Sequence, residues 1–390
     1  MQPRGDGPQA QRCGRRNSVA NHHFGNFGDL WKHLPMAELL VLAHPDRHWE
    51  THAGSALYTM TPSRGRAHGI GWYLRHAPAD DVLRECAYAR LTRPLFETVR
   101  RHERSSFEMT VVGDMSASGA SAASERPEVH PPPQVSIYPG SPWIAMAALG
   151  GCETRFVLCD LDEVSISSIR TAARHLDLNP DHLRAVRTDG IAMVADLIER
   201  LTPEEAARTF LFIDPFRPEI ASSTLGINAF DLWVRAAHRG CTAVLWYGFH
   251  HEAAVAGSAP PATRLISREV RHEELHRAIR SASVAESNTN SDKEDADTAR
   301  ATRFWCGEML LEAVFDPAVG DLAQLAVGIH GCGLLAANLP AGAVTRFRQI
   351  AMSLSRLYRT SSISDGIRSA SGALAYQEPA VIPAGLCDNV

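Results

Sequence analysis

The sequence has very little lysine and no long apolar run. Lys32 and Lys293 are the two lysines among 39 basic residues, so arginine supplies nearly all of the positive charge. A stretch of about 18 apolar residues, which a membrane-spanning helix needs, does not occur. The first residues, Met1 to Ser18, contain arginine, glutamine and glycine without the apolar core of a secretory signal. We therefore expect a cytoplasmic protein without a membrane partner.

Paired cysteines and phosphate-binding glycine motifs are also missing. None of the eight cysteines stands in a C-x-x-C pair, and a disulfide framework is not typical of a chain of 390 residues. The adjacent His250 and His251 would not face one point in a regular strand, so we expect no metal site. The turn His52-Ala53-Gly54-Ser55-Ala56-Leu57 has one glycine, which disfavours a dinucleotide site, and no P-loop motif occurs.

The charge distribution leaves the question of nucleic-acid binding open. The formal net charge is −5, which argues against general attraction to nucleic acid. Much of this charge lies in an acidic run from Glu286 to Asp297, so a basic face elsewhere is still compatible with the sequence. The arginine-rich stretch from Arg64 to Arg104 is either an RNA-binding surface or a solvated helical face.

Composition divides the chain into a folded body and segments of low complexity. We expect a disordered arm at 1–19 and a tail with little pattern at 359–390. Residues 20–62 are predicted to form an N-terminal helix and the first strand, and 63–137 a helical and low-complexity insertion, flexible between 113 and 133. The core is expected at 138–358, with an acidic disordered insertion at 281–301.

Apolar periodicity predicts alternating strands and helices. Helices are predicted at 27–43, 163–176, 191–201, 228–239 and 344–358, and strands at 49–52, 155–159, 183–187, 209–213 and 242–247. Two further strands, at 304–315 and 328–338, are expected to form an antiparallel pair. Pro35 inside the first helix indicates a kink or a late start. The pattern predicts an α/β fold of the Rossmann-like type, with a mostly parallel sheet and right-handed crossovers.

Polar residues stand where the predicted parallel strands end. They are Thr51-His52-Ala53-Gly54, Asp160, Asp189-Gly190 and Asp214-Pro215. Ligands of open α/β sheets bind at the carboxyl ends of the strands, so these residues are expected to surround one ligand. A carboxylate at the second strand end can accept ribose hydroxyl protons, a polar residue at the third can bind adenine, and one at the fourth faces the reacting group. This order of polar residues along the strand ends suits a nucleoside cofactor.

Several motifs together resemble a known enzyme family. They are His23-Phe24-Gly25-Asn26-Phe27-Gly28-Asp29-Leu30-Trp31-Lys32-His33, Thr51-His52-Ala53-Gly54, Tyr138-Pro139-Gly140-Ser141-Pro142, Asp189-Gly190, Ile213-Asp214-Pro215, Leu245-Trp246-Tyr247, Gly328-Ile329-His330-Gly331-Cys332-Gly333 and Asn338-Leu339-Pro340. In this order the chain resembles the bacterial 23S rRNA adenine-N6 methyltransferases of the RlmJ type, within the class I methyltransferases. The resemblance runs from about residue 22 to 355.

The resemblance implies a cofactor, a partner and a set of site residues. The cofactor would be S-adenosyl-L-methionine, the partner ribosomal RNA, and the role rRNA processing through RNA binding. The implied cofactor-binding residues are His33, His52, Ser141, Asp160, Asp189, Gly190 and Asp214. Asp214 would also contact the acceptor and orient the amine lone pair, with Lys32 beside it as a second catalytic residue. Pro215, Phe216 and Arg217 would bind the substrate.

The motif at the predicted catalytic aspartate leaves the acceptor open. Amino-methyltransferases have D-P-P-Y, whereas this chain has Asp214-Pro215-Phe216-Arg217, in which the phenyl ring or the flat guanidinium could stack on a base. A tyrosine that the family places near its N-terminus falls on Ser18. D-P-F and G-S-P also occur in the three-Cys-motif partner proteins. A methyltransferase of small molecules or of another nucleic acid, and a non-catalytic cofactor-binding partner protein, are therefore alternatives.

Overall fold

The computed structural model describes residues 24–61, 63–98, 137–250, 266–284, 302–312, 331–360 and 373–380. The predicted arm at 1–19, the flexible segment at 113–133 and His251 lie outside the described residues. Residues 285–301 of the acidic insertion also lie outside them.

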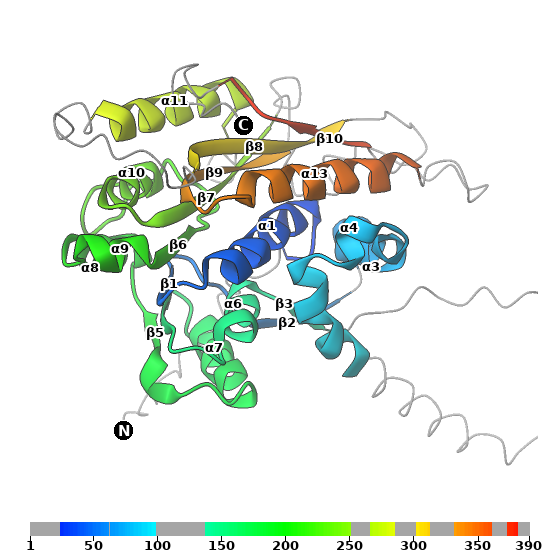
Figure 1. The fold of residues 1–390 in the computed structure, drawn as a ribbon, viewed down its shortest axis with the longest axis horizontal. Helices are drawn as coiled ribbons and strands as arrows, with labels where there is room; N and C mark the ends of the chain where they lie inside the picture. The colour runs from blue at the N-terminus through cyan, green and yellow to red at the C-terminus, as the bar shows by residue number, and fades with distance from the viewer. Residues whose placement is uncertain are drawn as a thin grey trace, which may run out of the picture.

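One eight-stranded sheet forms the centre of the molecule, in the order β10-β8-β9-β7-β6-β1-β4-β5 (Figure 1). The strands are β1 (Arg47–Glu50), β4 (Arg155–Asp160), β5 (Leu183–Arg187), β6 (Thr209–Ile213), β7 (Thr242–Phe249), β8 (Thr302–Glu312), β9 (Gly331–Leu339) and β10 (Ala373–Gln377). β5, β4, β1, β6 and β7 pair in parallel, while β9 is antiparallel to both β7 and β8, and β10 is antiparallel to β8. The predicted α/β fold with a mostly parallel sheet and an antiparallel late strand pair is confirmed.

The strand order places a switch point between β1 and β6. From β1 the sheet grows to one side through β4 and β5, and to the other side through β6 and β7. Parallel Rossmann-type sheets bind ligands in the crevice that such a reversal opens at the carboxyl ends of the strands. Glu50 at the end of β1 is in register with Phe212 in β6, so the residues that follow these two strands meet there.

Helices cover both faces of the sheet and bury its alternating side chains. In β6, Phe210 and Phe212 join one core, while Leu211 and Ile213 join the other. The first core contains α1 (Phe27–Ala43), α6 (Ser141–Leu149), α7 (Glu163–His175) and α13 (Ala343–Thr360). The second contains α8 (Gly190–Glu199), α9 (Pro203–Ala207), α10 (Ala229–Arg239) and α11 (Arg268–Val284). In Figure 1, α1 and α13 lie side by side over one face.

The insertion after β1 is helical, as predicted, over its described part. It contains α2 (Arg64–His68), α3 (Ile70–His76), the short 3₁₀ helix η2 (Ala77–Ala79), α4 (Asp81–Arg84) and a helical stretch at 87–98. A second 3₁₀ turn, η3 (Pro180–His182), precedes β5. Strand β2 (Leu57–Thr59) precedes the insertion in the chain and β3 (Ile137–Pro139) follows it. The two strands pair as a small antiparallel sheet. Ile70 and Tyr88 are buried in the core that also holds α1 and α13, so the insertion packs as part of the main body.

The structure differs from the sequence prediction at a few elements. The first strand is Arg47–Glu50 instead of 49–52, and α1 begins at Phe27 with Pro35 inside it, so a late start is excluded. The sequence pattern does not predict α11, and the last turn of this helix occupies 281–284, at the start of the segment expected to be a disordered insertion. The predicted tail contains β10, where Leu374 is buried among the apolar residues of the core.

Gly190 is a position where the fold tolerates no side chain. A Cβ atom there would lie 2.0 Å from the backbone carbonyl oxygen of Thr51. We expect Gly190→Ala to lower the free energy of unfolding by about 1–3 kcal/mol, because α8 must move away from the end of β1. Urea titration measures the change. Gly151→Ala is the matched control, since its Cβ would meet nothing within 4 Å. Equal stability of the two variants would contradict the close packing.

Candidate functional site

The N-terminus of α1 places an aspartate at the site. The Asn26 side chain accepts hydrogen bonds from the backbone N–H groups of Gly28 (2.8 Å) and Asp29 (3.2 Å). The Asp29 carboxylate in turn accepts the backbone N–H of Asn26 at 3.2 Å. This reciprocal capping box fixes the direction of the first helical turn. It leaves Asp29 Oδ1 facing the side chain of Lys32, one turn later.

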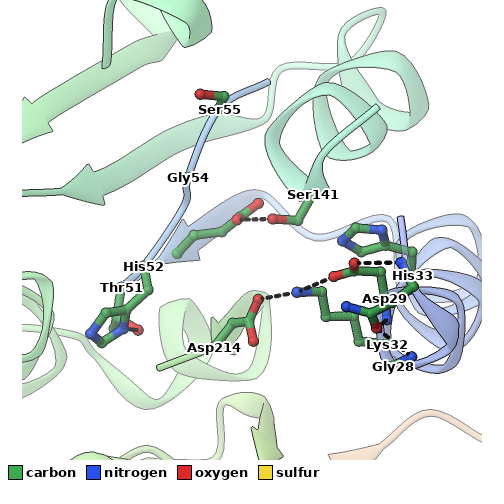
Figure 2. Close-up of polar contacts among 12 residues, drawn as sticks. Gly28, Asp29, Lys32, His33, Thr51, His52, Gly54, Ser55, Ser141 and Asp214 are labelled. Atoms are coloured by element: carbon green, nitrogen blue, oxygen red, sulfur yellow. Dashed lines mark hydrogen bonds and ion pairs between the residues drawn. The ribbon is translucent and has the colours of Figure 1, made fainter. Parts of the chain in front are cut away.

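Lys32 connects α1 to the end of β6. Its ammonium group lies 2.8 Å from Asp29 Oδ1 and 2.8 Å from Asp214 Oδ2 (Figure 2). The same group lies 5.4 Å from the ring centroid of Trp246, within the range of a cation–π contact. The side chains of Lys32 and Asp214 are only 15% and 11% exposed, so water screens the pair weakly. The two predicted catalytic residues are therefore in direct contact.

The electrostatic surroundings set the protonation of this pair. Burial raises the pKa of Asp214 to about 6, with Asp29 and Glu50 adding to the rise and Lys32 opposing it. Burial disfavours the charged form of Lys32, but Asp214 and Asp29 outweigh this effect, so the pKa of Lys32 lies above its ordinary value. At neutral pH the carboxylate of Asp214 is therefore ionised and paired with the Lys32 ammonium. The Asp214 carboxyl is poised to gain a proton in mildly acidic solution.

Beneath the site, a buried carboxylate at the end of β1 holds Ser141. Glu50 is fully buried and accepts a hydrogen bond from the Ser141 hydroxyl at 2.6 Å (Figure 2). Its other oxygen lies 2.8 Å from Nε2 of His48, which is also buried. Ser141 begins α6, and the hydrogen bond fixes this helix against the central strand. The hydroxyl of Ser141, predicted to contact a cofactor, is thus directed to Glu50.

His33 lies one residue beyond Lys32 on α1 and is buried. Its Nδ1 is 2.8 Å from the hydroxyl of Tyr138 in β3. Burial lowers the pKa of His33 well below its ordinary value, and the charge of Lys32 lowers it further, so the ring is neutral. Phe24 stacks on Tyr58 with ring centroids 4.4 Å apart, and the centroid of the Tyr138 ring lies 6.1 Å from that of Phe24. The predicted role of His33 at a cofactor stays a prediction.

The turn after β1 approaches the end of β4 closely. Gly54 adopts a left-handed conformation with φ of 62°, and its backbone N–H donates to Asp160 Oδ2 at 2.8 Å. The other oxygen of Asp160 accepts the backbone N–H of Asp162 at 2.8 Å. Burial raises the pKa of Asp160 above its ordinary value. An ionised carboxylate has about four acceptor positions, so Asp160 keeps capacity for further hydrogen-bond donors.

Asp189 and Gly190 lie at the N-terminus of α8, beside the end of β1. Asp189 caps the helix by accepting the N–H of Ala192 at 3.2 Å, and it also accepts the hydroxyl of Ser222 at 2.6 Å. Burial alone would raise the pKa of Asp189, but these donors lower it below its ordinary value. His52 hydrogen-bonds Thr51 at 2.8 Å, and burial lowers its pKa to about 4, so its ring is neutral.

The residues predicted to bind substrate follow Asp214 directly. Pro215 is buried, whereas the side chain of Phe216 is 42% exposed. Arg217 donates from Nε to Glu219 at 2.8 Å and is partly exposed. Phe216 thus presents an exposed aromatic ring two residues beyond Asp214 in the chain.

Sequence reasoning missed residues that organise the site. Asp29, Glu50, Trp246 and Glu219 contact predicted site residues but were assigned no role of their own. The pairing of Asp29 with Lys32 carries a usable signal, because an acid and a base three residues apart in a helix share one face. The contact of Glu50 with Ser141 joins segments 91 residues apart, for which local pattern gives no signal, whereas Glu219 lies two residues from Arg217.

Within the described part of the chain, no group of three or more histidine, cysteine, aspartate or glutamate residues is arranged to hold a metal ion. Among the same residues, no helix is long and apolar enough to cross a membrane.

Comparison with known proteins gives similarity of fold alone. No family model matches the chain, and no curated protein matches it. Among solved structures, it is similar to the protein LPL1258 from Legionella pneumophila str. Philadelphia 1, which is described by the family DUF519. The match covers 91% of this chain and 97% of that chain, at 18% identity and a TM-score of 0.51.

The Lys32 pair predicts a stability loss that depends on pH. We expect Lys32→Met to lower the free energy of unfolding by about 3–5 kcal/mol at about pH 8, since Asp29 and Asp214 lose their shared cation. Without Lys32, the folded-state pKa of Asp214 rises further above its ordinary value, because the attraction that opposes the effect of burial is lost. Stability is then retained at low pH and lost as pH rises, so the deficit should shrink at about pH 5.5.

Urea titration of Lys32→Met at both pH values measures this effect. Lys32→Arg, which keeps the positive charge, is the control and should show a smaller deficit with little pH dependence. A Lys32→Met deficit that is the same at both pH values would contradict the coupling of Lys32 to the two carboxylates.

Proposed function

We propose that this chain is an S-adenosylmethionine-dependent N-methyltransferase that acts on a nucleobase amine in RNA. The observation that carries the proposal is Asp214, an ionised and nearly buried carboxylate at the switch point of the sheet, followed by an exposed phenyl ring. A carboxylate in this setting can accept the hydrogens of an exocyclic amine, and the ring can stack on the base.

The residues around Asp214 suit the alignment of an amine. Asp214 Oδ2 is held by Lys32, whereas Oδ1 accepts no hydrogen bond within the described ranges. Oδ1 is therefore the atom that we assign to the amine hydrogen, with the carbonyl oxygen of Pro215 as a second acceptor. Methyl transfer to nitrogen is an in-line displacement, so the protein contributes mainly by holding both partners close and aligned. The cofactor supplies an activated methyl group when bound.

Residues at the neighbouring strand ends fit a nucleoside cofactor. Asp160 has acceptor capacity beyond the backbone groups of Gly54 and Asp162, as the ribose hydroxyls of a nucleoside require. Gly54 and Gly190 let the chain pack closely at these strand ends, since a Cβ atom would lie 2.4 Å from the Tyr58 hydroxyl oxygen or 2.0 Å from the Thr51 carbonyl oxygen. Asp189 is largely engaged by α8 and Ser222, so we assign the adenine contact to the backbone around it. The resemblance to RlmJ-type enzymes supports the same cofactor and favours ribosomal RNA.

Asp214 gives the sharpest test of the reaction. We expect Asp214→Asn to abolish methyl transfer to an unmodified 23S rRNA transcript, because the amide cannot replace both the ion pair and the acceptor oxygen. Wild-type transfer should fall as the pH drops below about 6, since the pKa of Asp214 lies there and the protonated carboxyl is no longer an acceptor. Transfer of a labelled methyl group across a pH series measures both effects.

The control is Asp196→Asn, at an exposed ion pair on α8 with Arg200. It should leave both the rate and the pH profile unchanged. Wild-type turnover by Asp214→Asn would refute the assignment of the aspartate. Transfer to small-molecule mixtures, without transfer to RNA, would replace the RNA acceptor by a small molecule.

Asp160 gives a separate test of the cofactor. We expect Asp160→Ala to weaken S-adenosylmethionine binding by about 1–3 kcal/mol, because charged hydrogen bonds to the ribose are lost. Asp160→Asn should lose less, since it keeps one acceptor oxygen. Calorimetry measures both affinities, with the exposed Asp181→Ala as control. Unchanged affinity in Asp160→Ala would count against the ribose role, and a wild-type protein without any binding would remove the cofactor assignment.

A further inference from the structure

The segment between β6 and α10 has a defined backbone conformation. We call residues 215–227 the acceptor loop, because they follow Asp214, the residue that we assign to the methyl acceptor. Within it, the Ile220 N–H donates to the Arg217 carbonyl at 3.1 Å, and the Ser222 N–H donates to the Ile227 carbonyl at 2.7 Å. The Ala229 N–H donates back to the Pro218 carbonyl at 3.1 Å. These bonds fold the loop on itself, and contacts outside it decide where it lies relative to Asp214.

One of these outside contacts comes from a fully buried arginine on α11. Arg271 has no exposed surface, and its guanidinium lies 5.6 Å from the Phe230 ring centroid. One terminal nitrogen donates to Glu274 at 2.7 Å, and the other donates to Glu219 at 3.1 Å and to the Gly248 carbonyl in β7 at 3.4 Å. A buried charge is costly unless it is paired, so these acceptors fix the guanidinium in one orientation. Arg271 thus joins α11, β7 and the acceptor loop.

Glu219 links Arg271 to the predicted substrate-binding residue Arg217. Its Oε2 accepts from Arg271 and its Oε1 accepts from Arg217 Nε at 2.8 Å, so one carboxylate lies between two guanidinium groups. The two arginines lower the pKa of Glu219 below its ordinary value against the opposing effect of burial. Glu219 is therefore ionised and holds the Nε end of the Arg217 guanidinium.

A second contact ties the same loop to the predicted cofactor side of the crevice. The Ser222 hydroxyl donates to Asp189 at 2.6 Å, and Thr224 lies within 3.4 Å of the same oxygen. The loop is thus held to α8 near its end and to α11 near its start. The loop also exposes Phe216, Ile220 and Leu225, each at least 42% exposed.

We propose that Arg271 is a positioning residue for the methyl acceptor. Acting through Glu219, it holds Arg217 and the start of the acceptor loop in the orientation that receives a nucleobase beside Asp214. This inference rests on the proposed function and names a residue outside the crevice that sets acceptor affinity. We expect cofactor affinity to depend little on Arg271, because within the described ranges its guanidinium contacts neither Asp160 nor Asp189.

The two glutamate partners of Arg271 provide a matched pair of variants. The exposed fractions of their side chains are similar, 16% for Glu219 and 18% for Glu274. Of these two, only Glu219 also binds Arg217. Glu219→Gln should raise the KM for a 23S rRNA transcript about fivefold or more, with kcat changed less, because a charged link to the acceptor loop is lost. Glu274→Gln should leave the KM for RNA near the wild-type value. Cofactor affinity by calorimetry should stay within about twofold in both variants.

A double-mutant cycle separates positioning from general stability. If Glu219 acts through Arg217, the KM effects of Glu219→Gln and Arg217→Ala are non-additive, and the double variant resembles Arg217→Ala alone. Additive effects, or an equal rise of KM in Glu274→Gln, would overturn the proposal. A parallel loss of cofactor affinity in Glu219→Gln would overturn it as well, since the variant would then disturb the whole crevice.

Hydrogen exchange gives a readout that does not depend on the reaction. Amides of the acceptor loop should exchange faster in Glu219→Gln than in Glu274→Gln, in protein without cofactor or RNA. Equal exchange in the two variants would overturn the anchoring role of Arg271. If exchange differs but wild-type protein transfers no methyl group to RNA, the anchoring stands, and both the proposed function and the acceptor role of Arg271 fall.

Discussion

The site depends on a single ammonium group that pairs with two largely buried carboxylates. Lys32 reaches from the first helix to the end of a central strand, and it can do so because the capping box of Asn26 and Asp29 sets the direction of that helix. Without this cation, Asp29 and Asp214 would face each other in a region that excludes water. The contact therefore fixes the position of α1 and keeps Asp214 ionised at neutral pH. The chain has two lysines, and one of them, Lys32, occupies this position between the two carboxylates.

Around this contact, the carboxyl ends of the central strands are fixed by hydrogen bonds that cross between elements. Ser141 to Glu50 joins α6 to β1, Gly54 to Asp160 joins the first turn to β4, and Ser222 to Asp189 joins the loop after β6 to α8. In each hydrogen bond, a donor at the end of one element meets an acceptor at the end of another. These hydrogen bonds fix the carboxyl ends of the central strands relative to one another, and the proposed function relies on that fixed arrangement to align its reactants.

Much of the fold could be predicted because local pattern encodes it. The leucines and alanines of 27–43 give a helical stripe, and β6 is a short apolar run that ends in Asp214. α11 was missed because charged residues dominate it and its buried stripe includes small side chains such as Ala278 and Ala282. For the site, strand ends predicted Asp160, Asp189 and Asp214. The contacts of Glu219 with Arg271 and of Glu50 with Ser141 span 52 and 91 residues, and hydrophobic periodicity carries no information about such pairs.

Strand β10 completes the sheet beside β8 but follows β8 in the chain, so this edge of the sheet is completed late in synthesis. Its residues Ala373–Gln377 pair with β8 at the outer edge, and Leu374 closes the core beneath it. Until this late segment leaves the ribosome, β8 presents a row of unpaired backbone groups, which is a template for pairing with other chains. Chains that end before residue 373 would keep that edge open permanently. Closure of this edge of the sheet thus requires a strand from the predicted C-terminal tail.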